Sequence, residues 1–274
     1  YSSGPCLRLS PKNYKIFFSS DLNSLSKWSR DWLIQFHPEK CSVMHLGRNN
    51  PHNNYFLNLH QLRKSKTERD LGVMVDNSLT FNEHIESKIG KARQIWGMIR
   101  RTFMTIDWDT FPLLFKAFVR PHLEYANCVW APAGKGTVKD IESVQRAATK
   151  QVPGLQRLSY PDRLRRLKLP TLKHRRRRGD LIEMFKMVSG AYDTDGIPSF
   201  EKVVANSLTR GHCYKIRRPI SKTALGHNRF TSRIVNDWNS LPDDVVGSPT
   251  MNTFKNRLDK YFENDPSVFD PDLS

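Results

Sequence analysis

Six apolar residues between Ile85 and Phe103 recur at alternating spacings of four and three residues. They are Ile85, Ile89, Ala92, Trp96, Ile99 and Phe103. Because a helical turn takes about 3.6 residues, this spacing gathers them on one face of a long amphipathic helix. Such a face needs an apolar partner. The nearest supplier is a second helix, predicted over residues 109–119 with Asp109 as its cap.

Helical periodicity dominates the chain after residue 80. Pro121 either breaks the second helix or opens a new one through Tyr125. Further helices are predicted over residues 138–151, 161–167, 171–188, 232–240 and 250–263. Residues 190–230 contain several glycines and prolines, so a loop with one or two weak strands is expected there.

The first 80 residues have a different pattern. Ser20 is expected to cap a helix that runs to Phe36, and His37-Pro38 ends it. Its apolar stripe consists of Leu22, Leu25, Trp28, Trp32 and Phe36. Three short extended runs follow, at residues 41–46, 55–62 and 71–75, and a small antiparallel sheet packed on the helix is expected.

The sequence therefore predicts an α+β fold, with a small antiparallel sheet and one helix followed by a mainly helical region. The expected segments are 1–19 (unplaced), 20–79 (helix and sheet), 80–190 (basic helical region), 191–263 (mixed and helical) and 264–274 (acidic tail). The tail contains no lysine or arginine and is expected to fray.

The chain is strongly basic. Its 274 residues include 44 lysines and arginines against 27 acids, a formal charge of +17. Eleven of the cations lie between Lys150 and Arg178, where Asp162 is the only acid. Three interpretations stay open: a solvated helix surface, a surface that contacts a phosphate backbone, or a nuclear-import signal made by residues 174–178.

A helical wheel distinguishes the four consecutive arginines of this region. Arg178 falls on the apolar stripe that Ile182, Phe185 and Val188 define, so it is expected to be partly buried and paired with a carboxylate. Arg175, Arg176 and Arg177 are expected to face solvent or a ligand.

The helix that carries the apolar seam also bears cations on its other faces. They are Lys88, Lys91, Arg93, Arg100 and Arg101. Two interpretations apply: ordinary surface cations whose aliphatic stems cover apolar residues, or a helix laid along a nucleic-acid backbone.

Several kinds of site are not indicated by the sequence. The four cysteines form no CxxC pair, and no nucleophile motif, glycine-rich phosphate loop or metal-binding histidine motif occurs. The doublet Asp243-Asp244 is expected to cap a helix or form a turn. No catalytic or metal-binding residue is predicted. No apolar run approaches the length of a membrane span, no signal peptide is visible and a reducing compartment is expected.

Long stretches of the chain resemble the C-terminal part of a reverse transcriptase from a non-LTR (LINE-like, jockey/CR1-type) retrotransposon. The resemblance covers most of residues 21–263. It is carried by LSKWSRDWLIQFHPEKCSVMHLGR (25–48), ERDLGVMVDNSLTFNEHI (68–85), VRPHLEYANCVW (119–130), IESVQRAATKQVPGLQRLSYPDRLRRLKLPTLKHRRRRGDLIEMFK (141–186), RGH (210–212), VNDWNSLPDDVV (235–246) and FKNRLDKYF (254–262).

This resemblance implies specific roles. Residues 21–47 correspond to the end of the palm, and Leu71, Gly72 and Val73 to the primer-grip hairpin. The helices after Thr80 correspond to the thumb and the region beyond it. The partners implied are an RNA template and a DNA primer, with no small-molecule cofactor or membrane, and the location implied is nuclear or cytoplasmic.

The catalytic centre of the family is the main departure. The family uses palm aspartates to hold two Mg or Mn ions, but residues 1–19 contain no aspartate or glutamate. We therefore expect a fragment that binds nucleic acid, needs no cofactor and does not polymerise by itself. Two alternatives remain open: a complete enzyme of which this is a part, and a non-enzymatic nucleic-acid-binding or protein-interaction module derived from a retrotransposon relic.

Overall fold

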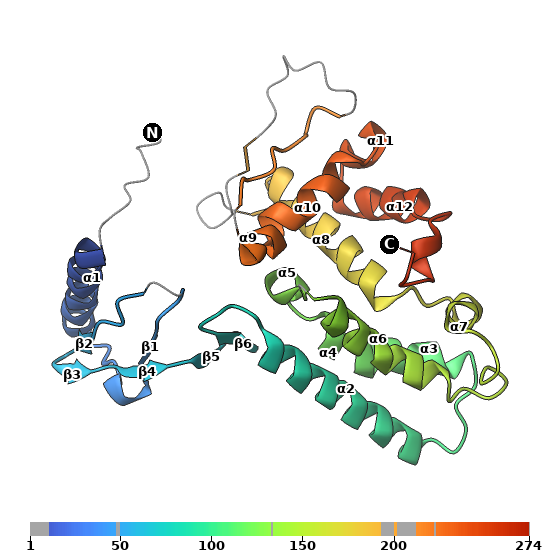
Figure 1. Ribbon diagram of the computed structural model, residues 1–274, viewed down its shortest axis with the longest axis horizontal. Coiled ribbons are helices and arrows are strands. Elements are labelled where there is room, and N and C mark those ends of the chain that lie inside the picture. Colours follow the sequence, from blue (N-terminus) through green and yellow to red (C-terminus); the bar gives the residue numbers. More distant parts are fainter. Residues whose placement is uncertain are drawn as a thin grey trace. The chain divides into compact units, whose positions relative to one another are not determined.

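The computed structural model describes residues 11–47, 50–132, 134–192, 200–201, 212–221 and 223–273 (Figure 1). The chain divides into two compact units, residues 1–79 and 80–274. The first unit contains one long helix and short strands, and the second is helical, so the α+β fold class is confirmed. Much of the mixed region predicted over 190–230, and most of the segment 1–19, lie outside the described residues.

The first unit opens with helix α1 (Pro11–Asp31), followed by η1 (Pro38–Lys40). Its strands are β1 (Ser42–Met44), β2 (Phe56–Leu57), β3 (His60–Gln61), β4 (Arg63–Ser65), β5 (Thr67–Asp70) and β6 (Val73–Asp76). Helix α1 begins well before the predicted cap, Ser20, and ends before Phe36. The proline at its first position suits a helix start because the first N–H groups of a helix have no partner within it.

The prediction that the apolar stripe of α1 is buried is wrong. Leu22 is buried and packs with Val43, Leu57 and Leu62, and Ser26 and Ser29 are buried as well. Three members of the stripe, Leu25, Trp28 and Trp32, are exposed. Strands of two to four residues are too short to cover a wide helix face, so only the side around Leu22 is buried against them.

The strands pair two by two and do not form one antiparallel sheet. β1 pairs in parallel with β4, and the antiparallel pairs are β2–β3 and β5–β6. The run 55–62, expected as one strand, folds back at Asn58 and Leu59, both of which have positive φ. Alternating hydrophobicity predicts that a strand forms but says nothing of its partner's direction. Here the segment between β1 and β4 is long enough to permit parallel pairing.

The second unit begins with α2 (Asn82–Thr102), which packs on α4 and α6. The predicted seam is confirmed for Ile85, Ile89, Ala92, Trp96 and Ile99, which are all buried, whereas Phe103 lies past the helix end and is partly exposed. The Trp96 ring meets Phe111 edge to face, with ring centroids 5.2 Å apart. Residues 109–119 are therefore one partner of the seam, as predicted, together with α4 and α6.

Three short segments follow one another directly over residues 110–124: α3 (Thr110–Leu114), the π-helical turn η2 (Phe115–Val119) and α4 (Arg120–Glu124). Asp107, and not Asp109, accepts a hydrogen bond from the Thr110 N–H, at 2.8 Å. Pro121 lies in the first turn of α4, so it opens a new helical segment there. A proline lacks an N–H, and its position directly after the wider π turn avoids the loss of an α-helical hydrogen bond.

The remaining helices are α5 (Asn127–Trp130), α6 (Lys135–Thr149), α7 (Tyr160–Leu167), α8 (Leu172–Val188), α9 (Ala224–Asn228), α10 (Phe230–Asn239), α11 (Asp243–Val246), α12 (Met251–Tyr261) and the short η4 (Pro266–Val268). Those predicted over residues 138–151, 161–167, 171–188, 232–240 and 250–263 follow their predicted ranges closely. The helices α5 and α9 were not predicted, and the second of them lies in the region 190–230, where a loop with weak strands was expected. Ser159, Thr171 and Thr250 cap α7, α8 and α12 through their side-chain oxygens. Asp243 and Asp244 form the first turn of α11, which agrees with their predicted cap or turn role.

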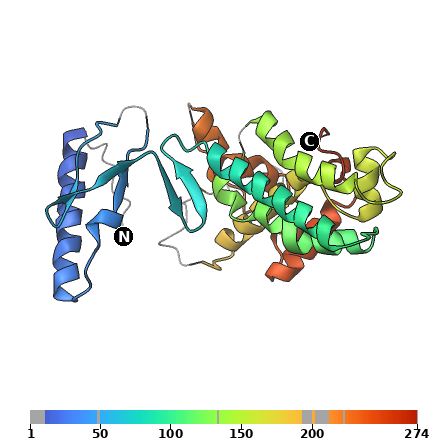
Figure 2. The ribbon, with the colours of Figure 1, turned by 90° about the horizontal axis from the view of Figure 1, so that it is seen from below.

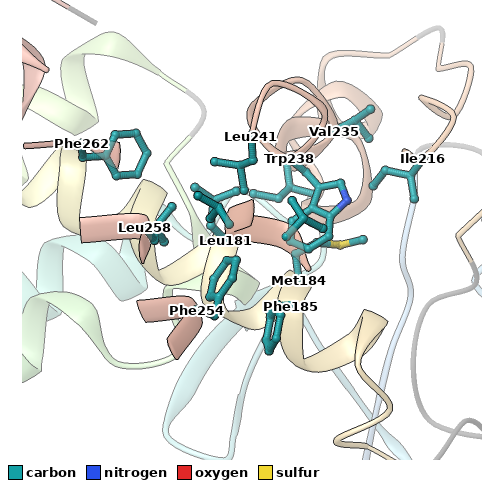
Figure 3. Packing of buried hydrophobic residues seen from close by; sticks show 13 residues of the cluster. Leu181, Met184, Phe185, Ile216, Val235, Trp238, Leu241, Phe254, Leu258 and Phe262 are labelled. Carbon is teal, nitrogen blue, oxygen red and sulfur yellow. The ribbon is translucent and has the colours of Figure 1, made fainter. Parts of the chain in front are cut away.

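The C-terminal half of the second unit has its own apolar core (Figure 3). Phe185 of α8 stacks on Phe254 of α12, with ring centroids 4.2 Å apart. Trp238 of α10 is fully buried, and its indole N–H donates to the Tyr214 carbonyl at 2.9 Å. Helix α8 thus lies between α10 and α12 on one side and α4, α5 and α6 on the other.

The acidic tail is not frayed, contrary to the expectation. The Thr171 N–H donates to the Val268 carbonyl at 2.8 Å, and the Asp265 carboxylate accepts from Arg177 at 3.4 Å. Lys173 Nζ reaches the Pro271 carbonyl at 3.1 Å. The tail carries only negative charge, and the start of α8 carries positive charge, so the two attract each other and the tail is held.

Candidate nucleic-acid interface

Helix α2 carries five cations on the faces that flank and oppose its buried seam. Lys91, Arg93, Arg100 and Arg101 are exposed, and Lys88 is half-buried. Arg93 donates to the Ser143 hydroxyl at 3.0 Å and Lys91 to the Gln94 side chain at 3.3 Å. Among the described residues, none of the five forms an ion pair with a carboxylate. Their charge therefore remains available to a negatively charged ligand.

A second group of cations lies on α6, on α7, on the loop that joins them and at the residue directly after α7. Its exposed members are Arg146, Lys150, Arg157, Arg165, Arg166 and Lys168. Within the described part of the chain, Arg165 is the one member of this group that pairs with a carboxylate, that of Asp162 at 2.8 Å. All of these residues except Arg146 belong to the dense cation run seen in the sequence.

Side-chain contacts connect the two groups. The Trp96 indole N–H donates to the Gln151 side chain at 2.8 Å, which joins α2 to the end of α6. The Arg166 guanidinium lies 4.3 Å from the ring centre of Trp108, in the loop that follows α2. Figures 1 and 2 show α2 against α6 from two directions. We call this surface, made by the cations of α2, the cations of α6–α7 and Trp108, the basic surface.

Trp108 adds an aromatic face to the basic surface. Its side chain is 47% exposed although an arginine stacks over it. Exposed aromatic rings beside arginines and lysines are the usual platform on which unpaired nucleic-acid bases stack. The resemblance and the charge pattern did not identify Trp108, because its exposure depends on how the loop folds onto α7.

The four arginines of α8 behave differently from the prediction. The prediction that Arg178 is partly buried and paired with a carboxylate is confirmed. Its side chain is 18% exposed and forms two hydrogen bonds to Asp259, at 2.5 and 2.8 Å. Arg175 does not face solvent but makes two 2.9 Å bonds to Glu124. Arg177 pairs with Asp237 at 2.9 Å and with Asp265 at 3.4 Å. Arg176 is buried.

The physical reason is the position of α8. A helical wheel assumes one buried face and one solvent face, but α8 has helices on both sides. Carboxylates of those neighbouring elements therefore meet Arg175 and Arg177, and these guanidiniums are already engaged. For this reason we do not include Arg175, Arg176 and Arg177 in the basic surface.

In the first unit, Leu71, Gly72 and Val73 lie at the tip of the β5–β6 hairpin. Asp70 pairs with Val73, so Leu71 and Gly72 form a two-residue turn, with φ of 43° and 84°. Positive φ at both positions is the geometry that favours glycine and matches the twist of a tight hairpin. Leu71 is exposed at the tip, whereas Val73 is buried. The structure thus gives these residues a hairpin, and their primer-grip role stays a prediction.

A buried polar network holds α6, α7 and α8 behind the basic surface. The Glu142 carboxylate accepts from the Tyr160 hydroxyl at 2.5 Å and from the Leu172 and Lys173 N–H groups at 3.2 Å. It therefore binds the first N–H groups of α8, where a negative charge is favoured. Burial raises the pKa of Glu142, and burial together with Glu142 raises the pKa of Tyr160. No motif in the sequence marks this network.

The described residues contain no group of three or more histidine, cysteine or acidic side chains that could hold a metal ion. In the parts of the chain that the structure covers, no helix combines the length and the apolar character needed to cross a bilayer.

Comparison with known proteins confirms the resemblance to non-LTR reverse transcriptases. The chain is 25% identical over 139 residues to the RNA-directed DNA polymerase from mobile element jockey of Drosophila melanogaster, which is 48% of this chain and 15% of that protein. It is 24% identical over 171 residues to the probable RNA-directed DNA polymerase from transposon X-element of the same organism, which is 58% of this chain and 18% of that protein.

An uncharacterized protein of Caenorhabditis elegans is 28% identical over 130 residues, 45% of this chain and 64% of that protein. The match therefore spans less than a fifth of each of the two polymerases. No protein-family model matches the chain. No solved structure matches it either.

Proposed function

We propose that this chain is a nucleic-acid-binding part of a jockey-like reverse transcriptase and that the basic surface contacts the backbone of an RNA template and a DNA primer. The observation that carries the proposal is the set of exposed cations on α2, which have no carboxylate partner among the described residues. Similarity to two RNA-directed DNA polymerases supports it, because their substrates are nucleic acids. An intracellular location, nuclear or cytoplasmic, belongs to the same proposal.

The chemistry of the basic surface favours contact with phosphates over reading of base sequence. Lysine and arginine side chains on a helix surface neutralise phosphates and release counterions, which makes binding strong at low salt and independent of sequence. Trp108 adds a face on which a base of either strand can stack. We expect weak, non-specific binding.

The 274-residue chain alone is expected to bind but not to polymerise. The complete family enzyme would use Mg or Mn, and the described residues of this chain present no carboxylate group that fits such ions. A primer-extension assay with either ion should show no incorporation. Templated DNA synthesis by this polypeptide would contradict this part of the proposal and leave the binding surface untouched.

Reversing three charges of α2 tests the surface directly. We expect K91E/R100E/R101E to weaken binding to an RNA–DNA hybrid by at least about tenfold at low salt, because each of the three cations neutralises a phosphate. The slope of log affinity against log salt should fall by about 0.9 for each phosphate that is no longer neutralised. Fluorescence anisotropy at several salt concentrations measures both quantities.

The matched control reverses three exposed cations elsewhere in the second unit, Arg218, Arg229 and Lys260. It changes the net charge equally, so it should retain most of the affinity if the basic surface is the site. If both variants lose affinity for the hybrid equally, the loss comes from the change in overall charge and not from the basic surface. A wild-type affinity that does not depend on salt would instead favour the protein-interaction module.

A further inference from the structure

A cavity of about 500 Å³ lies within the second unit, beside the first turns of α8. Residues of α8, α10, the segment around α5 and α6, and the C-terminal segment line it. Those with polar or charged side chains are Lys173, His174, Arg176, Arg177, Asp180, Arg233, Asp237, Asp265 and Ser267. Its volume falls in the range of small-molecule binding sites.

Arg176 is the unusual residue of this wall. It is only 6% exposed, and neither of its two terminal nitrogens has a hydrogen-bond partner. Its three neighbours in sequence, Arg175, Arg177 and Arg178, each bind a carboxylate. Arg176 is therefore a buried cation without a counter-charge in direct contact.

The acidic groups nearest to Arg176 are already engaged. Glu142 accepts from Tyr160 and from two backbone N–H groups. Glu124 receives two bonds from Arg175. Asp180 receives two bonds from Arg233, at 2.8 and 3.0 Å. These carboxylates lower the electrostatic cost of Arg176 but make no hydrogen bond to its terminal nitrogens.

The other charges of the cavity wall are largely paired with one another. Asp180 binds Arg233, while Asp237 and Asp265 both bind Arg177. Four cations thus face three carboxylates, and Arg176 makes no hydrogen bond to any of them through its terminal nitrogens. Burial lowers the pKa of Arg176, yet a guanidinium is too basic to lose its proton in a protein.

A buried guanidinium that cannot become neutral needs a bound anion or a polar partner. A planar guanidinium with two unused terminal nitrogens fits two oxygens of one phosphate group. His174, on the same wall, has an unpartnered Nδ1 that can donate in the tautomer that carries the proton there.

We propose that this cavity binds an oxyanion of the phosphate type, with Arg176 as its main contact. The occupant is a free phosphate or the terminal phosphate of a nucleic acid, since both present the same group. The site uses none of the α2 cations, so the result of its test is independent of the result for the proposed function.

The test is thermal unfolding of the full chain with inorganic phosphate, compared with chloride at equal ionic strength. At a phosphate concentration of about 100 times Kd, we expect Tm to rise by about 5 °C or more. Arg176→Met removes the buried charge. It should unfold at a higher temperature than the wild type without phosphate and should not respond to phosphate.

Arg178→Met is the matched control, because Arg178 lies on the same helix, pairs with an exposed carboxylate and does not line the cavity. It should keep the phosphate response. An equal response in the wild type and in Arg176→Met would overturn the proposal. If Arg176→Met fails to fold, the substitute experiment measures how the wild type and Arg176→Lys broaden the ³¹P NMR line of phosphate. Absence of broadening with the wild type would overturn the proposal.

Competition then identifies the source of the phosphate. An oligonucleotide with a 5′-phosphate should displace inorganic phosphate where its 5′-hydroxyl counterpart does not, if the occupant is a nucleic-acid end. If neither oligonucleotide displaces inorganic phosphate, the occupant of the site is free phosphate.

Discussion

Asp180→Asn is expected to lower the free energy of unfolding of the second unit by about 3–5 kcal/mol. Asp180 is buried on α8 and accepts from Arg233 Nε at 2.8 Å and Nη2 at 3.0 Å. Arg233 also donates to the carbonyls of Cys128 and Asn228, at 2.8 and 3.0 Å. The pair therefore joins α5, α8 and α10. Its loss leaves Arg233 without its counter-charge and removes one of the carboxylates nearest to Arg176.

Urea unfolding of Asp180→Asn and of a matched control measures this effect. The control is Asp259→Asn, which breaks the Arg178 pair on an exposed carboxylate and should cost less than about 1 kcal/mol. Equal costs for the two variants would show that burial of the Asp180 pair is energetically irrelevant.

A double variant separates the worth of the pair from the cost of breaking it. Burial raises the pKa of Asp180 even though Arg233 acts to lower it. The loss of hydration therefore disfavours the charged carboxylate more than the interaction with Arg233 favours it. Replacing both partners by apolar residues, as in Asp180→Leu with Arg233→Met, should therefore recover most of the stability that Asp180→Asn removes.

The apolar seam of α2 could be predicted because it depends on local periodicity alone. The spacing places Ile85, Ile89 and Trp96 on one face, and that face is buried because helices of the second unit cover it. The same reasoning failed for α1, where Trp28 and Trp32 form a regular stripe that the short strands of the first unit do not cover. Periodicity indicates which residues share a face, and the amount of neighbouring structure decides whether that face is buried.

The candidate site was predictable in part for a related reason. Exposed cations on α2 follow from lying outside the seam, so Arg100 on its flank and Arg101 opposite it are exposed as the helical pattern predicts. The engagement of Arg175 and Arg177 with carboxylates could not be predicted, because their partners lie far away in the chain. Glu124 is 51 residues from Arg175, and Asp265 is 88 residues from Arg177. Long-range ion pairs of this kind leave no local pattern, and the same holds for the cavity beside Arg176.

Acidification from pH 7 to 4 is expected to remove up to about 6 kcal/mol of stability through two buried histidines. His84 of α2 lies against Trp130 and His174 of α8 against Phe262, with ring centroids 5.4 and 4.9 Å apart. Burial lowers the pKa of each to about 4, helped by Lys88 for His84 and by Arg177 for His174.

The sign follows from which state binds the proton first. An unfolded histidine has a pKa of about 6.5, so as pH falls below this value the unfolded chain takes up protons that the folded chain refuses. The stability is complete above about pH 6.5 and declines as pH falls to 4, at about 1.4 kcal/mol per pH unit for each histidine. Carboxylates with lowered pKa, such as Asp107 and Asp162, act in the same direction but mainly below about pH 4.

The measurement is the free energy of unfolding in urea at several pH values between 7 and 4. The double variant His84→Leu with His174→Leu should lose most of the slope in this interval, whatever its stability at pH 7. His227→Gln, which changes an exposed histidine, should keep the full slope. A double variant with the wild-type slope would mean that both histidines are protonated in the folded chain at the same pH as in the unfolded one, and that their burial does not exclude the charge.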